Sequence, residues 1–378
     1  MRNIIRTRRD HITIKLLARH FTERSGIGGA AATWALAALF ILSFSTNTHA
    51  QSQVRIYLSS PGTNEVLRYK SGNGEFIDAF VTAGSGGLQA PSGISFGPDS
   101  NFYVASEGTD EVLRYDRNSG DFIDVFVTAG SGGLDVPGFI VFGPDDNLYV
   151  ASVGTNEVLR YDGETGEFMD VFVTAGSGGL DTPSGITFSV EGEFFVSSVG
   201  TNEVLRYDGS TGSFVEVFVA SGSGGLDGPR GITFHGTTNF YVSSINTNEV
   251  LKYDAGTGEF IEVFVTAGSG GLDSPLGVTF APDGWFYAVS RGSNQVIRYA
   301  GTNGQFLGSF ITPGSGGLSD PTVILFFPSK AVQALGGNCS LAEAGTHAVF
   351  PWFLITLFAL LIITRLFYKL FTNSGESM

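Results

Sequence analysis

Val204-Leu205-Arg206-Tyr207 is one copy of a motif that returns every 46 residues along the chain. The other five copies begin at Val66, Val112, Val158, Val250 and Val296. Around the quoted copy, four short segments at 183–188, 194–198, 203–207 and 214–219 are rich in β-branched and aromatic residues. Gly, Pro, Asn or Asp bounds each segment, which is the pattern of strands separated by turns. The repeat therefore predicts four strands in every 46 residues.

Four short antiparallel strands in a repeat of this length are typical of one blade of a β-propeller. A blade needs a neighbour against each of its two faces, which accounts for the apolar residues on both faces and for the 33 phenylalanines. We therefore predict an all-β fold, a closed six-bladed β-propeller of four-stranded antiparallel blades over residues 54–329, plus a C-terminal transmembrane helix.

The two ends of the repeat array predict how the ring closes. The first repeat begins at its second strand, residues 54–60, and the array ends with a lone first strand at 322–326. Pairing this lone strand with the first repeat completes six blades and removes the exposed edges that an open array would have.

The repeat also resembles a known family. Its pattern Pro-x-Gly-Ile-x-Phe-x-Pro-Asp-Gly-x-x-Tyr-Val, followed by Asn-x-Val-x-Arg-Tyr-Asp, looks like the NHL-type repeat and its relatives in the six-bladed propeller superfamily, and the resemblance covers all six repeats. It implies the fold but no single function, because such propellers host lyases, lactonases and pure binding modules.

Charge and composition exclude several classes of function. Residues 51–329 contain 11 basic and 32 acidic residues, which gives a net charge of −21 and disfavours nucleic acid as a partner. The single cysteine, Cys339, lies outside the repeats, and His235 is the only histidine within them. Zinc sites built on Cys and His, and triads with a histidine base, are therefore disfavoured, and we predict no cofactor.

Residues 1–50 predict an export signal with a long basic region. Seven Lys or Arg lie in the first 24 residues, an apolar run follows at 30–44, and Thr48 and Ala50 fit cleavage after Ala50. Arg8-Arg9 leaves the twin-arginine route open beside general secretion. The alternative is an uncleaved N-terminal membrane helix, for which the apolar run is short.

The C-terminal residues predict a membrane anchor. Residues 350–371 form an apolar segment with Arg365 and Lys369 near its end, which places the short tail 372–378 in the cytoplasm and the ring outside. The linker 330–349 and this segment together resemble bacterial C-terminal sorting signals of the Gly-Gly type, which rhomboid-like sortases process. The resemblance implies a sorting motif at Gly336, Gly337 and Cys339, and a permanent single-pass anchor is the alternative.

Two repeated motifs are predicted to be structural. Gly-Ser-Gly-Gly-Leu occurs six times and is interpreted as the tight connection between blades, since six copies cannot each be an active site. The residue after this motif is acidic in four repeats and differs in two, at Asp135, Asp181, Asp227, Asp273, Gln89 and Ser319. A ring of these acids could hold Ca²⁺, but we favour an aspartate that caps its own loop.

A repeated Glu and Arg, represented by Glu65 and Arg68, is interpreted as an internal pair that supports the packing between blades.

In a nearly identical array, a unique function is expected where the repeat is broken. The two most variable columns begin the first strand and end the second strand of each repeat, and Glu107, Arg230 and Arg291 are the only charges in them. Both columns are predicted to lie on the face that carries the connections between blades. These three residues are the candidate site for a partner, with drift on a tolerant surface as the alternative.

The leading functional prediction is a non-enzymatic binding module, exported and anchored to a membrane or cell surface, with a protein or carbohydrate ligand and a monomeric ring. A metal-dependent hydrolase of the sugar-lactonase type is one alternative, and a purely structural or adhesive surface protein is another. The inner strands repeat Gly-Ile-x-Phe with little polar variation, which disfavours a metal site in the centre. A lyase of the streptogramin type needs a catalytic histidine, for which only His235 is available.

Overall fold

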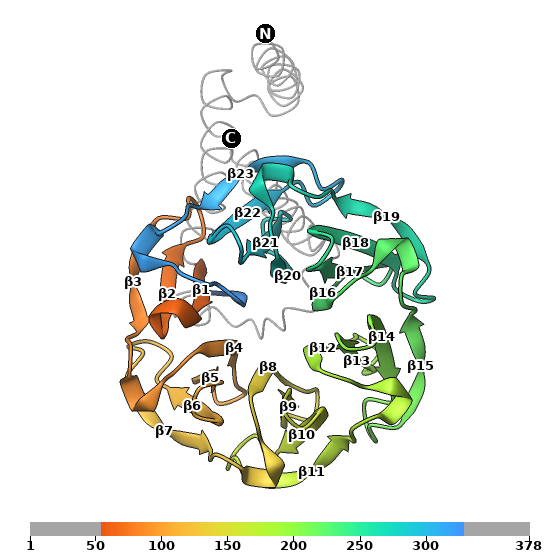
Figure 1. Ribbon diagram of the computed structural model, residues 1–378. Helices are drawn as coiled ribbons and strands as arrows, with labels where there is room; N and C mark the ends of the chain where they lie inside the picture. Colours follow the sequence, from red (N-terminus) through yellow and green to blue (C-terminus); the bar gives the residue numbers. More distant parts are fainter. Residues whose placement is uncertain (1–53, 329–378) are drawn as a thin grey trace, which may run out of the picture.

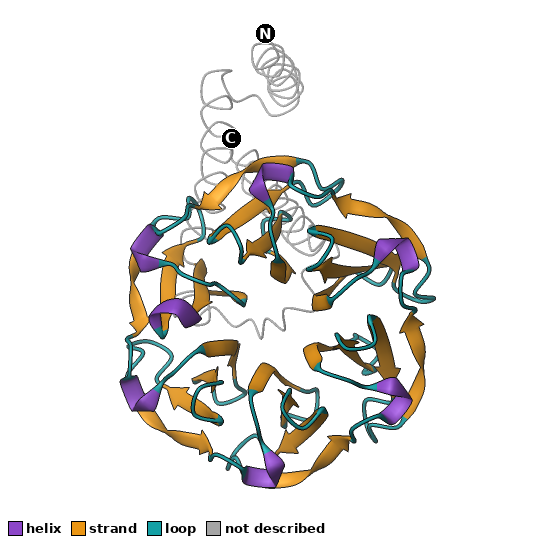
Figure 2. Cartoon of the chain, in the orientation of Figure 1, coloured by secondary structure: helices purple, strands orange, loops and turns teal. Residues whose placement is uncertain are grey.

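Six four-stranded antiparallel sheets surround a common axis like the blades of a propeller (Figures 1 and 2). The computed structural model describes residues 54–328. We number the blades 1 to 6 in chain order and count the strands of a blade from the axis outward. The prediction of a closed, six-bladed, all-β propeller is confirmed.

The strand bounds repeat closely from blade to blade. The first strands are β24 (Ile324–Pro328) in blade 1, then β4 (Pro91–Phe96), β8 (Pro137–Phe142), β12 (Pro183–Phe188), β16 (Pro229–His235) and β20 (Pro275–Phe280). The second strands are β1 (Val54–Ser60), β5 (Phe102–Ser106), β9 (Leu148–Ser152), β13 (Phe194–Ser198), β17 (Asn239–Ser244) and β21 (Phe286–Ser290). The third strands are β2 (Glu65–Lys70), β6 (Glu111–Tyr115), β10 (Glu157–Tyr161), β14 (Glu203–Tyr207), β18 (Glu249–Asp254) and β22 (Gln295–Tyr299). The fourth strands are β3 (Phe76–Val81), β7 (Phe122–Val127), β11 (Phe168–Val173), β15 (Phe214–Val219), β19 (Phe260–Val265) and β23 (Phe306–Ile311).

The Gly-Ser-Gly-Gly motif forms the connection from each blade to the next, as predicted. It holds the short 3-10 helices η2 (Ser85–Gly87), η3 (Ser131–Gly133), η4 (Ser177–Gly179), η5 (Ser223–Gly225), η6 (Ser269–Gly271) and η7 (Ser315–Gly317), while η1 (Pro61–Thr63) lies within blade 1. Gly84 and Gly86 have φ angles of 73° and 64°, a region that glycine enters without steric cost. A Cβ on Gly86 would collide with the ring of Phe122 in the next blade, so this glycine also permits close contact between blades.

The ring closes through the last strand of the array. β24 pairs antiparallel with β1, from Val54 opposite Pro328 to Leu58 opposite Ile324. The strand begins two residues later than the predicted 322–326, although Ser59 already donates its N–H to the Val323 carbonyl at 3.1 Å. The predicted closure of the first blade is therefore confirmed.

The hydrophobic core is divided into six layers, each between two neighbouring blades. In one of them, Tyr103 of blade 2 lies edge-on to Phe126 of its own blade and to Phe142 of blade 3, with ring centroids 4.9 Å apart in both pairs. Such edge-to-face pairs add stabilisation beyond the apolar area that they bury. Each blade is thus stabilised by its neighbours, which explains the apolar residues on both faces of the sheets.

A tyrosine in every third strand ties its blade to the preceding one. Its hydroxyl donates a hydrogen bond of 2.7 or 2.8 Å to the carbonyl of the serine in the preceding connection. The six pairs are Tyr69–Ser315, Tyr115–Ser85, Tyr161–Ser131, Tyr207–Ser177, Tyr253–Ser223 and Tyr299–Ser269. The first of them joins the two ends of the array.

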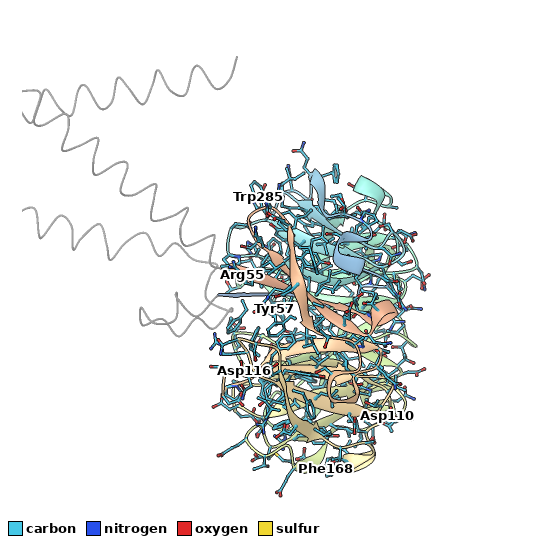
Figure 3. All side chains as sticks on the ribbon, turned by 90° about the vertical axis from the view of Figure 1, so that its left-hand side faces the viewer. Arg55, Tyr57, Asp110, Asp116, Phe168 and Trp285 are labelled. Atoms are coloured by element: carbon cyan, nitrogen blue, oxygen red, sulfur yellow. The ribbon has the colours of Figure 1, made fainter. Side chains whose placement is uncertain are left out.

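The two ends of the described chain lie at one face of the ring. Val54 starts β1 and Pro328 ends β24, and these two residues are paired. Seen edge-on, Arg55 and Asp116 lie at this face and Asp110 lies at the opposite face (Figure 3). We call the first the chain-end face, and the second, which carries the blade connections and the loops between second and third strands, the loop-rich face.

Residues 54–328 contain no helix that is long and apolar enough to span a membrane. The predicted export signal (1–50), linker (330–349), anchor (350–371) and tail (372–378) lie outside the described residues, as do Gly336, Gly337 and Cys339. These assignments remain predictions.

Candidate ligand-binding site on the loop-rich face

The three charged residues that break the repeat come together near the ring axis. Glu107 directly follows β5 in blade 2, Arg230 is the second residue of β16 in blade 5, and Arg291 directly follows β21 in blade 6. Although blades 2 and 5 lie on opposite sides of the ring, the positive charges of Arg291 and Arg230 both act on the Glu107 carboxylate. The predicted candidates therefore form one group. Asp320, whose charge also acts on Glu107, belongs to the group as well, and we call these four residues the axial cluster.

Glu107 is held half-buried at the end of its strand. Its N–H donates to the Ala90 carbonyl at 3.2 Å, which fixes the backbone against the preceding connection. Burial raises the pKa of the Glu107 carboxyl above its ordinary value, while a hydrogen bond from Ser92 and the two arginines oppose the rise. The carboxylate of Glu107 is thus more costly to ionise here than in water.

Arg291 is already paired with a carboxylate of the protein. Its Nε and Nη2 donate to the two oxygens of Asp320, the second at 2.8 Å, and the pair links blade 6 to the connection that leads into β24. Sequence analysis did not single out Asp320. It could have been found, because it is the only charge in a column that otherwise holds Ala90, Val136, Thr182, Gly228 and Ser274.

Arg230 is the uncommitted cation of the axial cluster. Its carbonyl accepts a hydrogen bond of 2.7 Å from the Ser197 hydroxyl of blade 4, so its backbone is fixed. Its guanidinium makes no ion pair with any residue of 54–328, and its Nε is buried without a hydrogen-bond partner. Burial and the charge of Arg291 lower the pKa of Arg230, and Glu107 opposes them. A buried donor without a partner is unfavourable, and a ligand acceptor would remove that cost.

An open depression of about 460 Å³ adjoins the axial cluster. Arg291 and Asp320 form part of its lining, together with Ile245, which belongs to the same variable column as Arg291. The depression is shallow and open to solvent, and neither Glu107 nor Arg230 belongs to its lining. A smaller hollow of about 210 Å³, lined by Glu191 and other residues, lies between blades 4 and 5 at the turns of the chain-end face.

The four aspartates of the blade connections are spread around the ring. Asp227 accepts a hydrogen bond of 2.9 Å from Asn246, and Asp181 accepts one of 3.0 Å from Thr182. The side chains of Asp135, Asp181 and Asp273 lie over a glycine of the neighbouring loop, where a Cβ would collide with them. Among residues 54–328, no three His, Cys, Asp or Glu side chains gather closely enough to hold one metal ion.

The predicted pairing of Glu65 with Arg68 is wrong. Arg68 binds Asp78 instead, with Nε and Nη2 at 3.0 and 2.6 Å from the carboxylate oxygens. Arg68 lies directly opposite Asp78 between the third and fourth strands, where the register shifts at a bulge. The equivalent arginines of blades 2 and 3 make the same contact, so these pairs stabilise the outer half of a blade.

His235 does not lie in the axial cluster. It is the last residue of β16 and therefore lies at the chain-end face. Its ring stacks on Phe280 of blade 6 with centroids 3.9 Å apart, and burial and Lys252 lower its pKa. The side chain therefore fills the space between two blades.

Comparison with known proteins supports the fold. No family model matches the chain, and no curated protein matches it. A chain of a nidogen/laminin complex is similar in structure, with a TM-score of 0.59 and 16% identity over 72% of this chain and 98% of that chain. Virginiamycin B lyase from Staphylococcus aureus is also similar (TM-score 0.49, 15% identity, 73% of this chain and 81% of that chain), as is a streptogramin B lyase (0.45, 19%, 60% and 70%). The nidogen/laminin match supports a β-propeller, identities this low show no activity, and the NHL-type relationship remains a prediction.

Proposed function

We propose that this protein is an exported, surface- or membrane-anchored propeller that binds a protein or carbohydrate ligand on its loop-rich face without catalysing a reaction. The observation that carries the proposal is the axial cluster. Glu107, Arg230 and Arg291 are far apart in the sequence and break an otherwise regular repeat, yet they act on one another across the ring axis. A ligand that binds at one unique place on the ring must contact residues that differ from their equivalents in the other blades.

Arg230 supplies the strongest polar contact that a ligand could gain there. The Asp320 carboxylate already occupies Arg291, whereas the buried Nε of Arg230 has no acceptor. A guanidinium presents a planar set of donors suited to carboxylate and other flat oxygen groups. We therefore assign ligand binding to Arg230 and Glu107, and assign to Arg291 the role of holding the cluster in place.

The position of the chain ends supports the choice of face. The described chain enters and leaves the ring at the chain-end face. If the residues after 328 anchor the protein, as their sequence predicts, the loop-rich face points away from the membrane and remains accessible to a ligand.

Binding by site-directed variants tests the proposal. We expect the full-length protein to bind to a glycan array or to an array of bacterial surface proteins. Arg230→Ala and Glu107→Gln should each weaken the strongest signal several-fold, while the matched variant Glu164→Gln, at an exposed turn of the chain-end face, should not. Loss of binding in Glu164→Gln alone would place the site on the opposite face.

Metal analysis separates the proposal from the lactonase alternative. A binding module of this kind needs no ion, so the purified protein is expected to hold no transition metal or calcium in stoichiometric amount. One bound metal per chain, together with hydrolysis of a lactone, would replace the binding proposal by the enzymatic one.

Protease accessibility tests the proposed location. Protease added to intact spheroplasts should degrade the ring and leave the C-terminal tail protected, because basic residues follow the predicted anchor on its cytoplasmic side. Full protection of the ring would contradict export.

A further inference from the structure

In five of the six blades, the basic residue of the third strand is paired with an acid of the fourth strand. Arg68, Arg114 and Arg160 donate from Nε and Nη2 to both oxygens of the aspartate ten residues later, at 3.0–3.1 Å and 2.5–2.6 Å. Arg206 and Lys252 lie 3.3 and 3.1 Å from a glutamate at the same position. In each of these five blades, the cation of the third strand thus binds a carboxylate of the fourth strand.

Blade 6 keeps the cation and lacks the acid. Arg298 in β22 lies opposite Gly308 in β23, where the other blades have Asp or Glu. Its guanidinium still lies 5.1 Å over the ring of Phe310, as that of Arg160 lies 5.2 Å over Phe172. Arg298 makes no ion pair with any residue of 54–328. Its Nε is buried without a hydrogen-bond partner among those residues, as is that of Arg206, whose Nη1 is nevertheless paired with Glu216.

The base of the missing side chain has room. A Cβ on Gly308 would meet no heavy atom within 4 Å. We propose that this gap beside Arg298 is a binding site for a carboxylate supplied from outside the described ring. The ligand would take the two-oxygen contact that Asp78, Asp124 and Asp170 make in their own blades.

An exposed tryptophan precedes the strand that pairs with the strand of Arg298. Tyr287 of β21 lies directly opposite Arg298, and Trp285 directly precedes β21, two residues before Tyr287. Trp285 is 39% exposed, and its column otherwise holds Arg55, Asn101, Asn147, Glu193 and Asn239. A large exposed apolar ring in the same blade as a guanidinium that lacks an ion pair suits a ligand that combines an apolar group with an acid.

The distribution of charge directs an anion to this part of the ring. Residues 137–182, which contain blade 3, hold eight acidic residues and one arginine, a net charge of −7. Residues 275–320, which contain blade 6, hold two acidic residues and two arginines, a net charge of zero. An anionic ligand is therefore repelled from one side of the ring and admitted at the other.

The site is distinct from the axial cluster and does not depend on it. The internal acids that occupy the same place are carboxylates of Asp and Glu, so the ligand is expected to be a carboxylate. It could come from a small organic acid or from an acidic side chain of a peptide, and the peptide would also be able to contact Trp285.

Calorimetric titration of the full-length protein in detergent distinguishes these sources. The probes are sodium acetate, the peptide Ac-Gly-Ile-Asp-Val-Gly-NH₂, whose centre copies the outer strand of blade 2, and the same peptide with Asn in place of Asp. We expect the Asp peptide to bind at least tenfold more tightly than the Asn peptide. If the Asp peptide also binds tenfold more tightly than acetate, the natural ligand is a protein. If the Asp peptide and acetate bind with equal affinity, the natural ligand is a small organic acid.

Variants locate the binding. Arg298→Met keeps an apolar stem over Phe310 and should lower the affinity for the Asp peptide at least tenfold. Arg298→Lys should retain part of that affinity. The matched control is Arg160→Met, whose guanidinium is already bound to Asp170 and whose loss should leave peptide binding unchanged. Thermal melting should fall in Arg160→Met but not in Arg298→Met, because only the first leaves a carboxylate without its partner.

Three outcomes would overturn the inference. They are no binding of either carboxylate probe, equal binding of the Asp and Asn peptides, and unchanged affinity in Arg298→Met. Binding that survives in Arg298→Met but is lost in Arg230→Met would move the carboxylate to the axial cluster, which would overturn this inference and support the proposed function.

Discussion

The guanidinium of Arg160 shows how a single side chain joins several parts of a blade. It binds Asp170 across the strand pair at 2.5 Å, approaches Asp145 at 3.9 Å and lies over the ring of Phe172. Hydrogen bonds to charged groups contribute more than neutral ones, although the exposure of Asp170 weakens the contact.

We predict that Arg160→Ala lowers the free energy of unfolding by about 1 to 2 kcal/mol. A double-mutant cycle in urea should show coupling of Arg160 to Asp170 and none to Glu157, its neighbour in sequence. Coupling to Glu157 instead would restore the pairing that the sequence predicts and contradict the observed contacts.

Glu107 predicts a pH dependence whose sign follows from burial. Burial raises its pKa in the folded protein above the ordinary value of 4.5, so the folded state favours the neutral acid. The associated stability is present below pH 4.5 and is lost as the pH rises through the folded pKa.

Glu107→Gln removes the group whose ionisation lowers stability at neutral pH. The melting temperature of the variant should be close to that of the wild type at pH 4 and higher than it at pH 7. The exposed control Glu164→Gln should show no such difference. If Glu107→Gln melts lower at pH 7, attraction to Arg230 and Arg291 outweighs the cost of burial.

Residue-scale features were predictable only in part. Glu107, Arg230 and Arg291 were found because they are charges in otherwise uncharged columns, and the structure brings them together. That Arg291 is occupied by Asp320 could not be deduced, because the two side chains come from different loops, 29 residues apart. The pairing of Arg68 was missed because bulges between the third and fourth strands set which residues face each other.

The loops of neighbouring blades are joined by a repeated hydrogen bond on the loop-rich face. The side-chain oxygen of Asn202, in the loop after β13, accepts the N–H of Gly228 in the next connection at 2.7 Å. The same bond of 2.6 or 2.7 Å occurs in the other five blades, in the pairs Asn64–Ala90, Asp110–Val136, Asn156–Thr182, Asn248–Ser274 and Asn294–Asp320. These bonds tie each loop to the following blade connection all around the loop-rich face.

Asn202→Gly deletes one of these bonds without straining the backbone, because position 202 has a φ of 60° that glycine adopts freely. We expect a loss of about 1 kcal/mol in urea unfolding. Asn202→Asp is the matched variant, since Asp110 makes this bond in blade 2, and it should unfold close to the wild type. Equal stability of Asn202→Gly and the wild type would show that the bond adds nothing.

At the scale of elements, the sequence was nearly sufficient. The strands predicted at 183–188, 194–198, 203–207 and 214–219 are all observed with those bounds, because each is short, apolar and limited by turn residues. The last strand begins at Ile324 rather than at 322, since Thr322 and Val323 bond to β1 without regular strand geometry.

For the molecule as a whole, closure depends on the contact between its first and last described strands. Besides pairing with β1, the last strand supplies Phe327, which stacks on Phe96 of blade 2 with centroids 3.7 Å apart, and Phe326, which packs on Tyr287 of blade 6 at 4.8 Å. It therefore contributes to the core on both sides of blade 1.

Deleting residues 321–329 should therefore open the ring. The change leaves the edge of β1 and the aromatic rings of blades 2 and 6 exposed, and such edges pair with other chains. We expect a lower melting temperature and aggregation when the deletion is made in the propeller fragment 51–329, measured by calorimetry and light scattering.

A circular permutant keeps all residues of the ring and serves as the control. It starts at residue 319 and ends at residue 318. A copy of the turn 97–101, which links the first two strands of blade 2, joins Pro328 to Val54. Because the permutant restores every contact of β24 within one hairpin, it should melt within a few degrees of the unpermuted ring. If the deletion melts as high as the permutant, the last strand does not close the propeller.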